Sequence, residues 1–233
     1  MMETDRIYNL DCMVGMKDIP DGSVDLIIMD PPYDFGSGSG AGSFGYNARP
    51  NTHQLDSISK GISNDVLDEC MRVMRTPNIY IWCNKRQLRQ YIDYFDDRGC
   101  SVDLLTWHKT NPIPRCSNQY LPDTEYLLFF RKDAPLYGEY DTKSKYWVTG
   151  LNTKDRDLYG HPTIKPLDII RRLVMNSSKE GDVVLDPYLG SGTTAVAAKT
   201  LKRHYIGFEI DPDYYNIAVK RLNSAVKRTL MEY

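Results

Sequence analysis

Short apolar runs separated by polar turns recur along the chain, and segments with helical spacing lie between many of them. Three of these runs are residues 24–29 (Val-Asp-Leu-Ile-Ile-Met), 78–83 and 205–209. Short runs rich in β-branched and aromatic residues are typical of strands buried in a parallel sheet. Their alternation with helical segments predicts an α/β fold.

The helical segments carry apolar residues three and four positions apart, as in 62–75, which ends before Pro77. The predicted strands are 6–11, 24–29, 78–83, 101–108, 125–131, 181–186 and 205–209. The predicted helices are 62–75, 87–95, 167–177, 193–200 and 212–228, with helical turns at 13–19. No crossover helix fits between 101–108 and 125–131, so we expect these two strands to be antiparallel neighbours.

Two long segments show neither pattern. Residues 34–61 mix glycine and serine with Phe35, Phe44 and Tyr46, and such a segment loses too much backbone entropy to hold one shape unaided. We expect a mobile lid that orders when substrate binds, with a plain disordered insertion as the alternative. Residues 133–160 are polar, aromatic and basic, and we expect an insertion outside the sheet. Its composition suits contact with nucleic acid, and a peripheral structural flap is the alternative.

Composition is ordinary for a globular protein, with 233 residues, 41% hydrophobic and 26% charged, and predicts one domain over 1–233. No apolar stretch approaches the roughly 20 residues that cross a bilayer, so we expect no membrane association. The first residues lack the basic-then-apolar order of a secretory signal. The five cysteines show no Cys-x-x-Cys spacing, which favours reduced thiols in a cytoplasmic protein over a zinc site or disulfides.

The net charge of −2 does not by itself indicate a nucleic-acid-binding protein. Its distribution is uneven, because residues 1–34 hold eight acids and two bases, a balance of −6, which leaves +4 on the other 199 residues. A solvated surface of mixed charge is the simpler interpretation. A face that follows a phosphate backbone is the alternative.

The tetrapeptide Asp30-Pro31-Pro32-Tyr33 directly follows the strand 24–29. Two prolines cannot continue a β ladder, so the strand must end there. The turn places a carboxylate, prolyl carbonyls and an aromatic ring at the carboxyl end of a strand, where open α/β sheets bind ligands. We interpret it as a site that holds an exocyclic amino group and stacks a flat ring. A strand terminator without chemistry is the alternative.

Residues 187–194 (Pro-Tyr-Leu-Gly-Ser-Gly-Thr-Thr) form a second turn, between a strand and a helix. Its glycines let the backbone approach a ligand, and the helix N-terminus offers unpaired N–H groups. Glu209 lies 19 residues after Gly190, near the offset of about 20 expected of an acid that binds ribose hydroxyls. The turn lacks the third glycine of the dinucleotide fingerprint and the lysine of a P-loop. The pattern still predicts a nucleoside ligand.

Together the two turns resemble those of S-adenosylmethionine-dependent amino-methyltransferases of DNA. Residues 30–33 precede the motif at 186–194 (Asp-Pro-x-x-Gly-Ser-Gly-Thr-Thr), with the insertion between them, an order that resembles the beta group. The resemblance covers 5–34, 62–131 and 161–211. It implies a Rossmann-like three-layer sandwich with a circularly permuted, mostly parallel sheet of seven strands, one of them antiparallel. It also implies S-adenosylmethionine as cofactor and DNA as substrate.

The resemblance further implies roles for single residues. The residues that would bind the cofactor are Asp11, Thr163, Lys165, Asp186, Gly190, Ser191, Gly192, Thr193 and Glu209. The catalytic residues would be Asp30, Pro31, Pro32 and Tyr33, and the substrate would also contact Tyr33, Lys109, Asn111 and Arg115. Leu10 stands where the family commonly has a small residue, which would alter packing near the cofactor's adenine. The short insertion implies target recognition that is relaxed or shared with a partner chain.

The implied mechanism follows from the chemistry of the acceptor. An amino group conjugated to an aromatic ring is a poor nucleophile because its lone pair is delocalised. Asp30 and the Pro31 carbonyl would accept its two N–H groups and direct the lone pair to the methyl group, while Tyr33 stacks the base. The target base must be flipped out of the duplex, and no metal is required.

Several alternatives remain at this stage. Asp30 favours N6 of adenine over N4 of cytosine, whose catalytic turn more often begins with serine in this family. Cytosine C5 methylation needs a Pro-Cys nucleophile, and none of the five cysteines follows a proline. An inactive, methyltransferase-like DNA-binding subunit is a third interpretation. We also expect a bacterial or phage-like restriction-modification context, in which a homodimer is possible.

Overall fold

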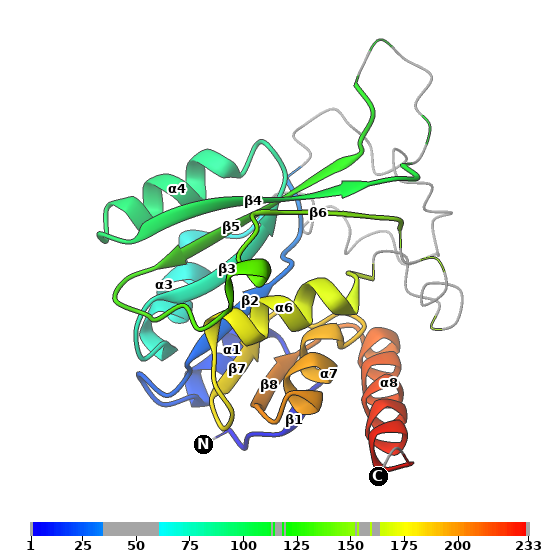
Figure 1. Cartoon of the computed structure of the whole chain (residues 1–233). Helices are drawn as coiled ribbons and strands as arrows, with labels where there is room; N and C mark the ends of the chain where they lie inside the picture. The colour runs from blue at the N-terminus through cyan, green and yellow to red at the C-terminus, as the bar shows by residue number, and fades with distance from the viewer. Residues whose placement is uncertain are drawn as a thin grey trace.

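The computed structural model describes residues 2–34, 61–112, 114, 118, 120–151, 153, 159 and 164–231. Its strands are β1 (Arg6–Tyr8), β2 (Leu26–Met29), β3 (Asn78–Cys83), β4 (Ser101–Lys109), β5 (Thr124–Arg131), β6 (Tyr146–Thr149), β7 (Val183–Asp186) and β8 (His204–Phe208). Its helices are α1 (Cys12–Gly15), α3 (Asn64–Val73), α4 (Leu88–Asp96), α6 (Leu167–Ser177), α7 (Thr193–Thr200) and α8 (Pro212–Met231), with 3₁₀ turns η1 (Met16–Asp18) and η4 (Tyr140–Thr142). The strands form one sheet in the order β1-β8-β7-β2-β3-β5-β4-β6 (Figure 1).

Every strand of this sheet except β5 runs in the same direction. β2 pairs in parallel with both β3 and β7, whereas β5 is antiparallel to β3 and to β4. The prediction that residues 101–108 and 125–131 form antiparallel neighbours is therefore confirmed. The predicted Rossmann-like α/β fold with a mostly parallel sheet is confirmed as well.

The strand count corrects one prediction. Among the described residues the sheet has eight strands where we expected seven. The additional strand is β6, in which Trp147 is in parallel register with Trp107 of β4 at the sheet edge. The expectation that residues 133–160 lie outside the sheet is thus wrong for β6. Its residues, Tyr-Trp-Val-Thr, are aromatic and β-branched, but the run is only four residues long and only Trp147 is buried, so it does not stand out as a buried strand.

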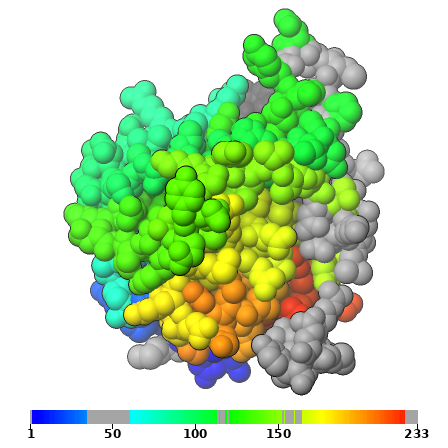
Figure 2. All heavy atoms as spheres, in the orientation of Figure 1, coloured from blue at the N-terminus to red at the C-terminus, as the bar shows by residue number. Residues whose placement is uncertain are grey.

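The segment before β6 packs on α6. Arg172 of α6 donates from Nε to the Thr142 carbonyl at 2.5 Å, and Asn176 donates from Nδ2 to the same carbonyl at 2.8 Å. The Tyr137 N–H donates to the Asn176 carbonyl at 2.7 Å. In Figure 2 the green surface of this segment adjoins the yellow surface of α6. This part of the predicted insertion is therefore fixed to the body of the domain.

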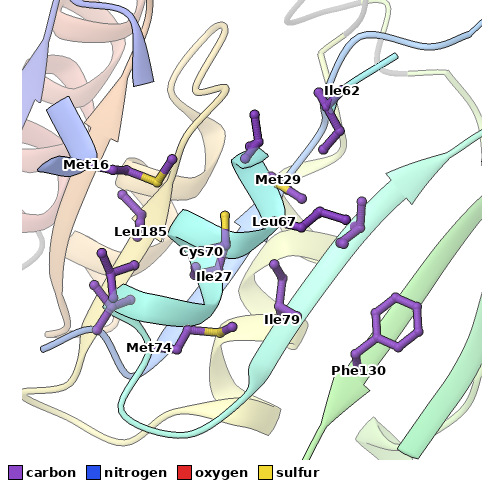
Figure 3. Close-up of a cluster of buried hydrophobic side chains, with 14 of the residues drawn as sticks. Met16, Ile27, Met29, Ile62, Leu67, Cys70, Met74, Ile79, Phe130 and Leu185 are labelled. Carbon is purple, nitrogen blue, oxygen red and sulfur yellow. The ribbon is translucent and has the colours of Figure 1, made fainter. Parts of the chain in front are cut away.

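Alternate residues of the central strands supply two apolar cores, one on each face of the sheet. Ile27 and Met29 of β2 belong to the core beneath α3 and α4, whereas Leu26 and Ile28 belong to the core beneath α6, α7 and α8. Figure 3 shows Cys70 of α3 beside strand residues of the first core, including Ile27. Burial on both faces explains why β2 reads as a continuous apolar run.

The first described helix after β2 and the helix after β7 lie on opposite faces of the sheet. β2 is followed by α3, which packs in the first core, and β7 is followed by α7, which packs in the second. The two strands are hydrogen-bonded neighbours, with Ile27 in register with Leu185. Such a divergence between neighbouring parallel strands marks the edge where open α/β sheets bind ligands.

Candidate active site

The predicted site residues gather at one edge of the sheet because parallel strands end on the same side. Asp30 follows β2, Asp186 is the last residue of β7, and Glu209 follows β8. The two chemical turns, 30–33 and 187–192, therefore follow hydrogen-bonded neighbours. The antiparallel strand β5 starts at this same edge and adds side chains from its first residues.

Asp30 forms an ion pair with Lys165, a residue that the family resemblance assigns to the cofactor. Lys165 Nζ lies 2.6 Å from Asp30 Oδ2, and the lysine side chain is 10% exposed. Lys165 also donates to the Tyr33 hydroxyl at 3.5 Å. The Tyr33 hydroxyl interacts with the Asp30 carboxyl group and acts to lower its pKa. Asp30 Oδ1 is buried and has no partner with hydrogen-bond geometry in the part of the chain that the structure describes. One oxygen of this carboxylate is thus paired, and the other is left as an acceptor.

Glu125, the second residue of β5, extends this pair into a chain of alternating charges. Its Oε2 lies 3.2 Å from Lys165 Nζ, and its Oε1 lies 2.6 Å from Nζ of Lys109, the last residue of β4. Sequence reasoning identified Lys109 and Lys165 but not Glu125. One sequence feature indicates Glu125: it is a glutamate at the start of an apolar strand, and the antiparallel neighbour of that strand ends in lysine.

Burial and pairing act in opposite directions on these groups. Burial raises the pKa of Asp30, and the positive charge of Lys165 offsets only part of that effect. Burial also opposes the charge of Lys165, but Asp30 and Glu125 together outweigh it and raise the pKa of Lys165. Burial likewise opposes the charge of Glu125, yet Lys165 and Lys109 lower its pKa. Lys165 therefore stays charged but is shared between two carboxylates.

Two side chains that the sequence did not single out fix the backbone of the Asp30 turn. Gln87 donates from Nε2 to the Pro32 carbonyl at 3.1 Å, and Asn84 donates from Nδ2 to the Asp34 carbonyl at 2.6 Å. Gln87 is buried and also donates to the Tyr91 hydroxyl at 2.9 Å. The turn is therefore held in place by the segment between β3 and α4.

The second turn brings together two residues predicted to bind the cofactor. Gly190 and Gly192 have φ of 54° and 81°, a conformation that glycine adopts without strain. The Gly190 N–H donates to Glu209 Oε2 at 2.8 Å, and the Asp211 N–H donates to Glu209 Oε1 at 2.8 Å. Burial raises the pKa of Glu209, although these two hydrogen bonds act to lower it. The offset of 19 residues between Gly190 and Glu209 thus corresponds to a direct hydrogen bond.

Arg221 of α8 lies beside the start of α7 as a buried cation. Its guanidinium donates to Thr193 Oγ1 at 2.7 Å and to Ser191 Oγ at 3.0 Å. A hydroxyl oxygen that accepts in this way keeps its own O–H as a donor. Sequence reasoning found Ser191 and Thr193 but missed Arg221, because the long C-terminal helix shows no local sign of which base faces the turn.

Asp186 is the other buried carboxyl of the second turn. Its Oδ1 accepts the Tyr188 N–H at 3.0 Å. Burial raises its pKa to about 7, although hydrogen bonds from Thr194 and Tyr188 act to lower it. A buried carboxyl with this pKa ionises readily when a cation binds beside it, so it suits a positively charged ligand.

Asp11 caps α1 rather than ending a strand. β1 ends at Tyr8, three residues earlier, and Asp11 Oδ1 accepts the Met13 N–H at 2.8 Å. Asn9 donates from Nδ2 to the Glu209 carbonyl at 2.8 Å and so joins the segments after β1 and β8. Asp11 is thereby held on the same side of the sheet as Glu209.

Among the residues expected to contact substrate, Asn111 accepts the Leu151 N–H on its Oδ1 at 2.7 Å. This contact joins the loop after β4 to the loop after β6. Arg115 and the predicted cofactor residue Thr163 lie outside the described residues, as does the expected lid apart from its first and last residues, Asp34 and Gly61.

The four described cysteines, Cys12, Cys70, Cys83 and Cys100, are buried and form no disulfide with one another. No group of His, Cys, Asp and Glu suited to a metal ion occurs in the described ranges. A search of those ranges also finds no helix with the length and apolarity to cross a membrane.

Comparison with known proteins assigns this geometry to a family. A model of the N6/N4 DNA methylase family matches residues 24–220, a range that includes both turns and Lys165. The chain belongs to the DNA methylase family. This methylase is 33% identical to the Type II methyltransferase M2.LlaDCHI of Lactococcus lactis subsp. cremoris, over 93% of the chain and 88% of that relative. The resemblance drawn from the two turns is thereby confirmed.

Solved structures agree with the assignment. The methylase matches the crystal structure of the M1.HpyAVI–SAM complex with a TM-score of 0.72 and 27% identity, over 94% of this chain and 98% of that one. It matches the PvuII DNA methyltransferase (cytosine-N4-specific) with a TM-score of 0.69 and 14% identity, over 98% and 93% of the two chains. Because the second match shows the fold alone, it leaves the choice of base to the residues of the site.

Proposed function

We propose that this DNA methylase transfers a methyl group from S-adenosylmethionine to the N6 amino group of adenine in DNA. The observation that carries the proposal is the position of the two turns on neighbouring strands. Asp30 follows β2, Asp186 ends β7, and these strands are hydrogen-bonded to each other. A donor bound at one turn and an amine bound at the other would lie side by side, as transfer requires.

The residues of the second turn suit this cofactor. Asp186 would ionise beside its positively charged groups, and the start of α7 would supply N–H groups and the hydroxyls of Ser191 and Thr193. Glu209 would accept the ribose hydroxyls, and Asp11 would approach the adenine. When bound, S-adenosylmethionine supplies an activated methyl group on a sulfonium and a thioether leaving group. The neighbouring M1.HpyAVI structure is a complex with SAM.

Thr163 and Lys165 differ from the other predicted cofactor residues in what supports their roles. Thr163 stays in the proposed cofactor set on the strength of the family motif. For Lys165, the 2.6 Å contact with Asp30 Oδ2 supports a role on the acceptor side of the site.

The first turn suits an aromatic amine. Asp30 Oδ1 would accept one N–H and the Pro31 carbonyl the other, which would draw the nitrogen toward tetrahedral geometry and expose its lone pair. The buried position of Oδ1 without a partner among described residues supports this role. Tyr33 would stack the base and Pro32 would keep the turn rigid, since Gln87 already holds the Pro32 carbonyl. Asp30 then acts as an orienting acceptor rather than a strong general base.

Asp30 also supports adenine as the target base, because the cytosine-N4 enzymes of this family more often carry serine at that position. N4 of cytosine remains the alternative function. An inactive DNA-binding subunit would have no need of the catalytic acid or of the turn glycines, and this chain retains Asp30, Gly190 and Gly192.

Access to this site requires the target base to leave the duplex, because an amine inside the base stack cannot reach Asp30. Lys109, Asn111 and Arg115 are proposed to face the DNA. The named relative is a Type II methyltransferase, which supports a bacterial restriction-modification role for this chain too. A cytoplasmic location and, in the simplest assembly, a homodimer belong to the same proposal.

Transfer of a tritiated methyl group from S-adenosylmethionine to DNA tests the function. The wild-type protein is expected to label DNA, and Asp30→Ala is expected to lower the rate at least about 100-fold, as removal of an oriented polar group at a reaction centre does. Cofactor binding, measured by calorimetry, is expected to change little in this variant.

Arg75→Met is the matched control, because Arg75 pairs with Asp25 at the opposite end of the β2 segment and its side chain is 64% exposed. Loss of cofactor binding in Asp30→Ala would contradict the division of the site into donor and acceptor turns. A wild-type protein that shifts DNA on a gel yet transfers no label would support the inactive subunit.

A further inference from the structure

Four charged side chains from four segments form a connected row at the acceptor side of the site. Asp30 follows β2, Lys165 precedes α6, Glu125 is the second residue of β5 and Lys109 ends β4. Their charges alternate along the row. Lys165 Nζ lies 2.6 Å from Asp30 Oδ2 and 3.2 Å from Glu125 Oε2. Lys109 Nζ lies 2.6 Å from Glu125 Oε1. All four side chains are at most 28% exposed, so solvent screens these contacts only weakly.

On the basis of the proposed function, we infer that Lys165 and Glu125 are positioning residues of the transfer site. Lys165 holds Oδ2 of Asp30 and keeps the carboxylate charged and oriented, which leaves Oδ1 as the acceptor of the target amine. Glu125 holds Lys165 and, by sharing it, limits how strongly the lysine neutralises Asp30.

The geometry gives each residue a separate task. Without Lys165, Asp30 would be a buried carboxylate that burial drives toward its neutral form, and a protonated oxygen is a poor acceptor for an N–H group. Without Glu125, Lys165 would pair with Asp30 alone and withdraw electron density from the oxygen that faces the amine. The shared lysine therefore keeps Asp30 both ionised and able to accept a hydrogen bond.

Among the other titratable groups around Asp30, the Tyr33 hydroxyl also favours the charged form of Asp30, but less strongly than Lys165 does. The groups that face it are Tyr33 of its own turn, Cys83 of β3, Tyr91 of α4 and Asp186 of β7. Burial raises the pKa of Cys83 to about 12 and that of Tyr33 and Tyr91 above their ordinary values, so these three are neutral at pH 7. Among the groups that face Asp30 in the described residues, Asp186, with a pKa raised to about 7, is the one that changes charge near neutral pH.

Titration of Asp30 by carbon-13 NMR of its carboxyl group tests the inference on the intact protein without cofactor or DNA. The Asp30→Asn protein identifies the signal. Lys165→Met, which removes the charge and keeps most of the length of the side chain, is expected to raise the pKa of Asp30 by roughly 1 to 3 pH units, the usual effect of losing an opposite charge at this distance. Glu125→Gln is expected to lower it by a smaller amount.

The same two variants are then followed through the pH dependence of a single round of methyl transfer. The acidic limb of the rate profile is expected to move to higher pH in Lys165→Met and to lower pH in Glu125→Gln. Opposite movements distinguish positioning from a structural role, because a variant that merely loosens the fold lowers the rate without moving the limb. Arg75→Met should leave both the titration and the profile unchanged.

A titration of Asp30 that does not move in either variant, or moves in the same direction in both, would overturn the inference. If Lys165→Met does not fold, the direction found for Glu125→Gln decides alone. The proposed function fails separately, through a wild-type protein that transfers no methyl group to DNA, and the NMR result stands in that case.

Discussion

At the scale of single residues, the site is built from carboxyl groups whose charge is opposed by burial. Burial raises the pKa of Asp30, Asp186 and Glu209. The positive charge of Lys165 offsets part of this effect at Asp30, whereas the hydrogen-bond donors to Glu209 and Asp186 in the described residues are neutral. Asp186 therefore carries an electrostatic cost in the ligand-free protein that a cationic ligand would remove.

Asp186→Asn tests this cost through the pH dependence of stability. The pKa of Asp186 is raised to about 7 from an ordinary value of 3.8, so between these values the folded protein holds a proton that the unfolded chain has lost. The contribution of Asp186 to the free energy of unfolding therefore falls as pH rises and is lost above about pH 7. The variant keeps the Oδ1 acceptor for Tyr188 and lacks the charge.

Urea unfolding at pH 5 and at pH 8 measures the difference between the two proteins. We expect the free energy of unfolding of the variant, relative to that of the wild type, to increase by up to about 4 kcal/mol at pH 8 and by much less at pH 5. A gap that is the same at both pH values would show that Asp186 ionises in the folded protein as easily as in the unfolded chain.

The identity of the site residues was easier to predict than their partners. Asp30 and Gly190 stand in local motifs, so their positions at strand ends follow from a few neighbouring residues. The pairing of Lys165 with Asp30 joins residues 135 positions apart and leaves no local pattern. Glu125 and Arg221 were missed for the same reason, since each acts through a contact that exists only after the sheet has formed.

At the scale of elements, the junction of α7 with α8 determines the shape of the second turn. Gly192 is the N-cap of α7, and a Cβ at this position would lie 2.9 Å from the Cβ of Ala218 in α8. Arg221 lies three residues after Ala218, on the same face of α8, and donates to Thr193. The absence of a side chain at Gly192 thus lets α8 approach closely enough for Arg221 to reach the turn.

Gly192→Ala should therefore destabilise the protein and weaken cofactor binding. The strain of φ 81° and the contact with Ala218 add together, and we expect a loss of about 2 to 4 kcal/mol in the free energy of unfolding. Gly181→Ala is the matched control, because Gly181 has φ of 84° but no atom within 4 Å of its added Cβ. Equal losses in the two variants, measured by urea unfolding, would contradict the packing argument.

The accuracy of the predicted element bounds varies along the chain. The bounds of β3, α6 and α7 agree with the prediction at both ends. β1 ends three residues early, since the side chain of Asn9 turns to the carbonyls after β8. β6 was missed because an edge strand pairs through its backbone, and its exposed residues are free to be polar or aromatic.

At the scale of the whole molecule, the order of the sheet joins two distant parts of the chain into one site. The acceptor turn near residue 30 and the donor turn near residue 190 follow neighbouring strands, with α3 and α7 on opposite faces. The antiparallel strand β5 presents its first residues at the same edge and delivers Glu125 to the row of charges. The fold thus positions donor, acceptor and charge network without any of them being close in sequence.

The measurement that tests this account most directly is mass spectrometry of nucleosides from DNA incubated with the protein and deuterated-methyl S-adenosylmethionine. We predict labelled N6-methyladenine in the wild-type reaction and none with Asp30→Ala. Labelled N4-methylcytosine would contradict the choice of base while supporting the site. DNA without any labelled nucleoside would contradict the central claim that the two turns hold a methyl donor and its acceptor.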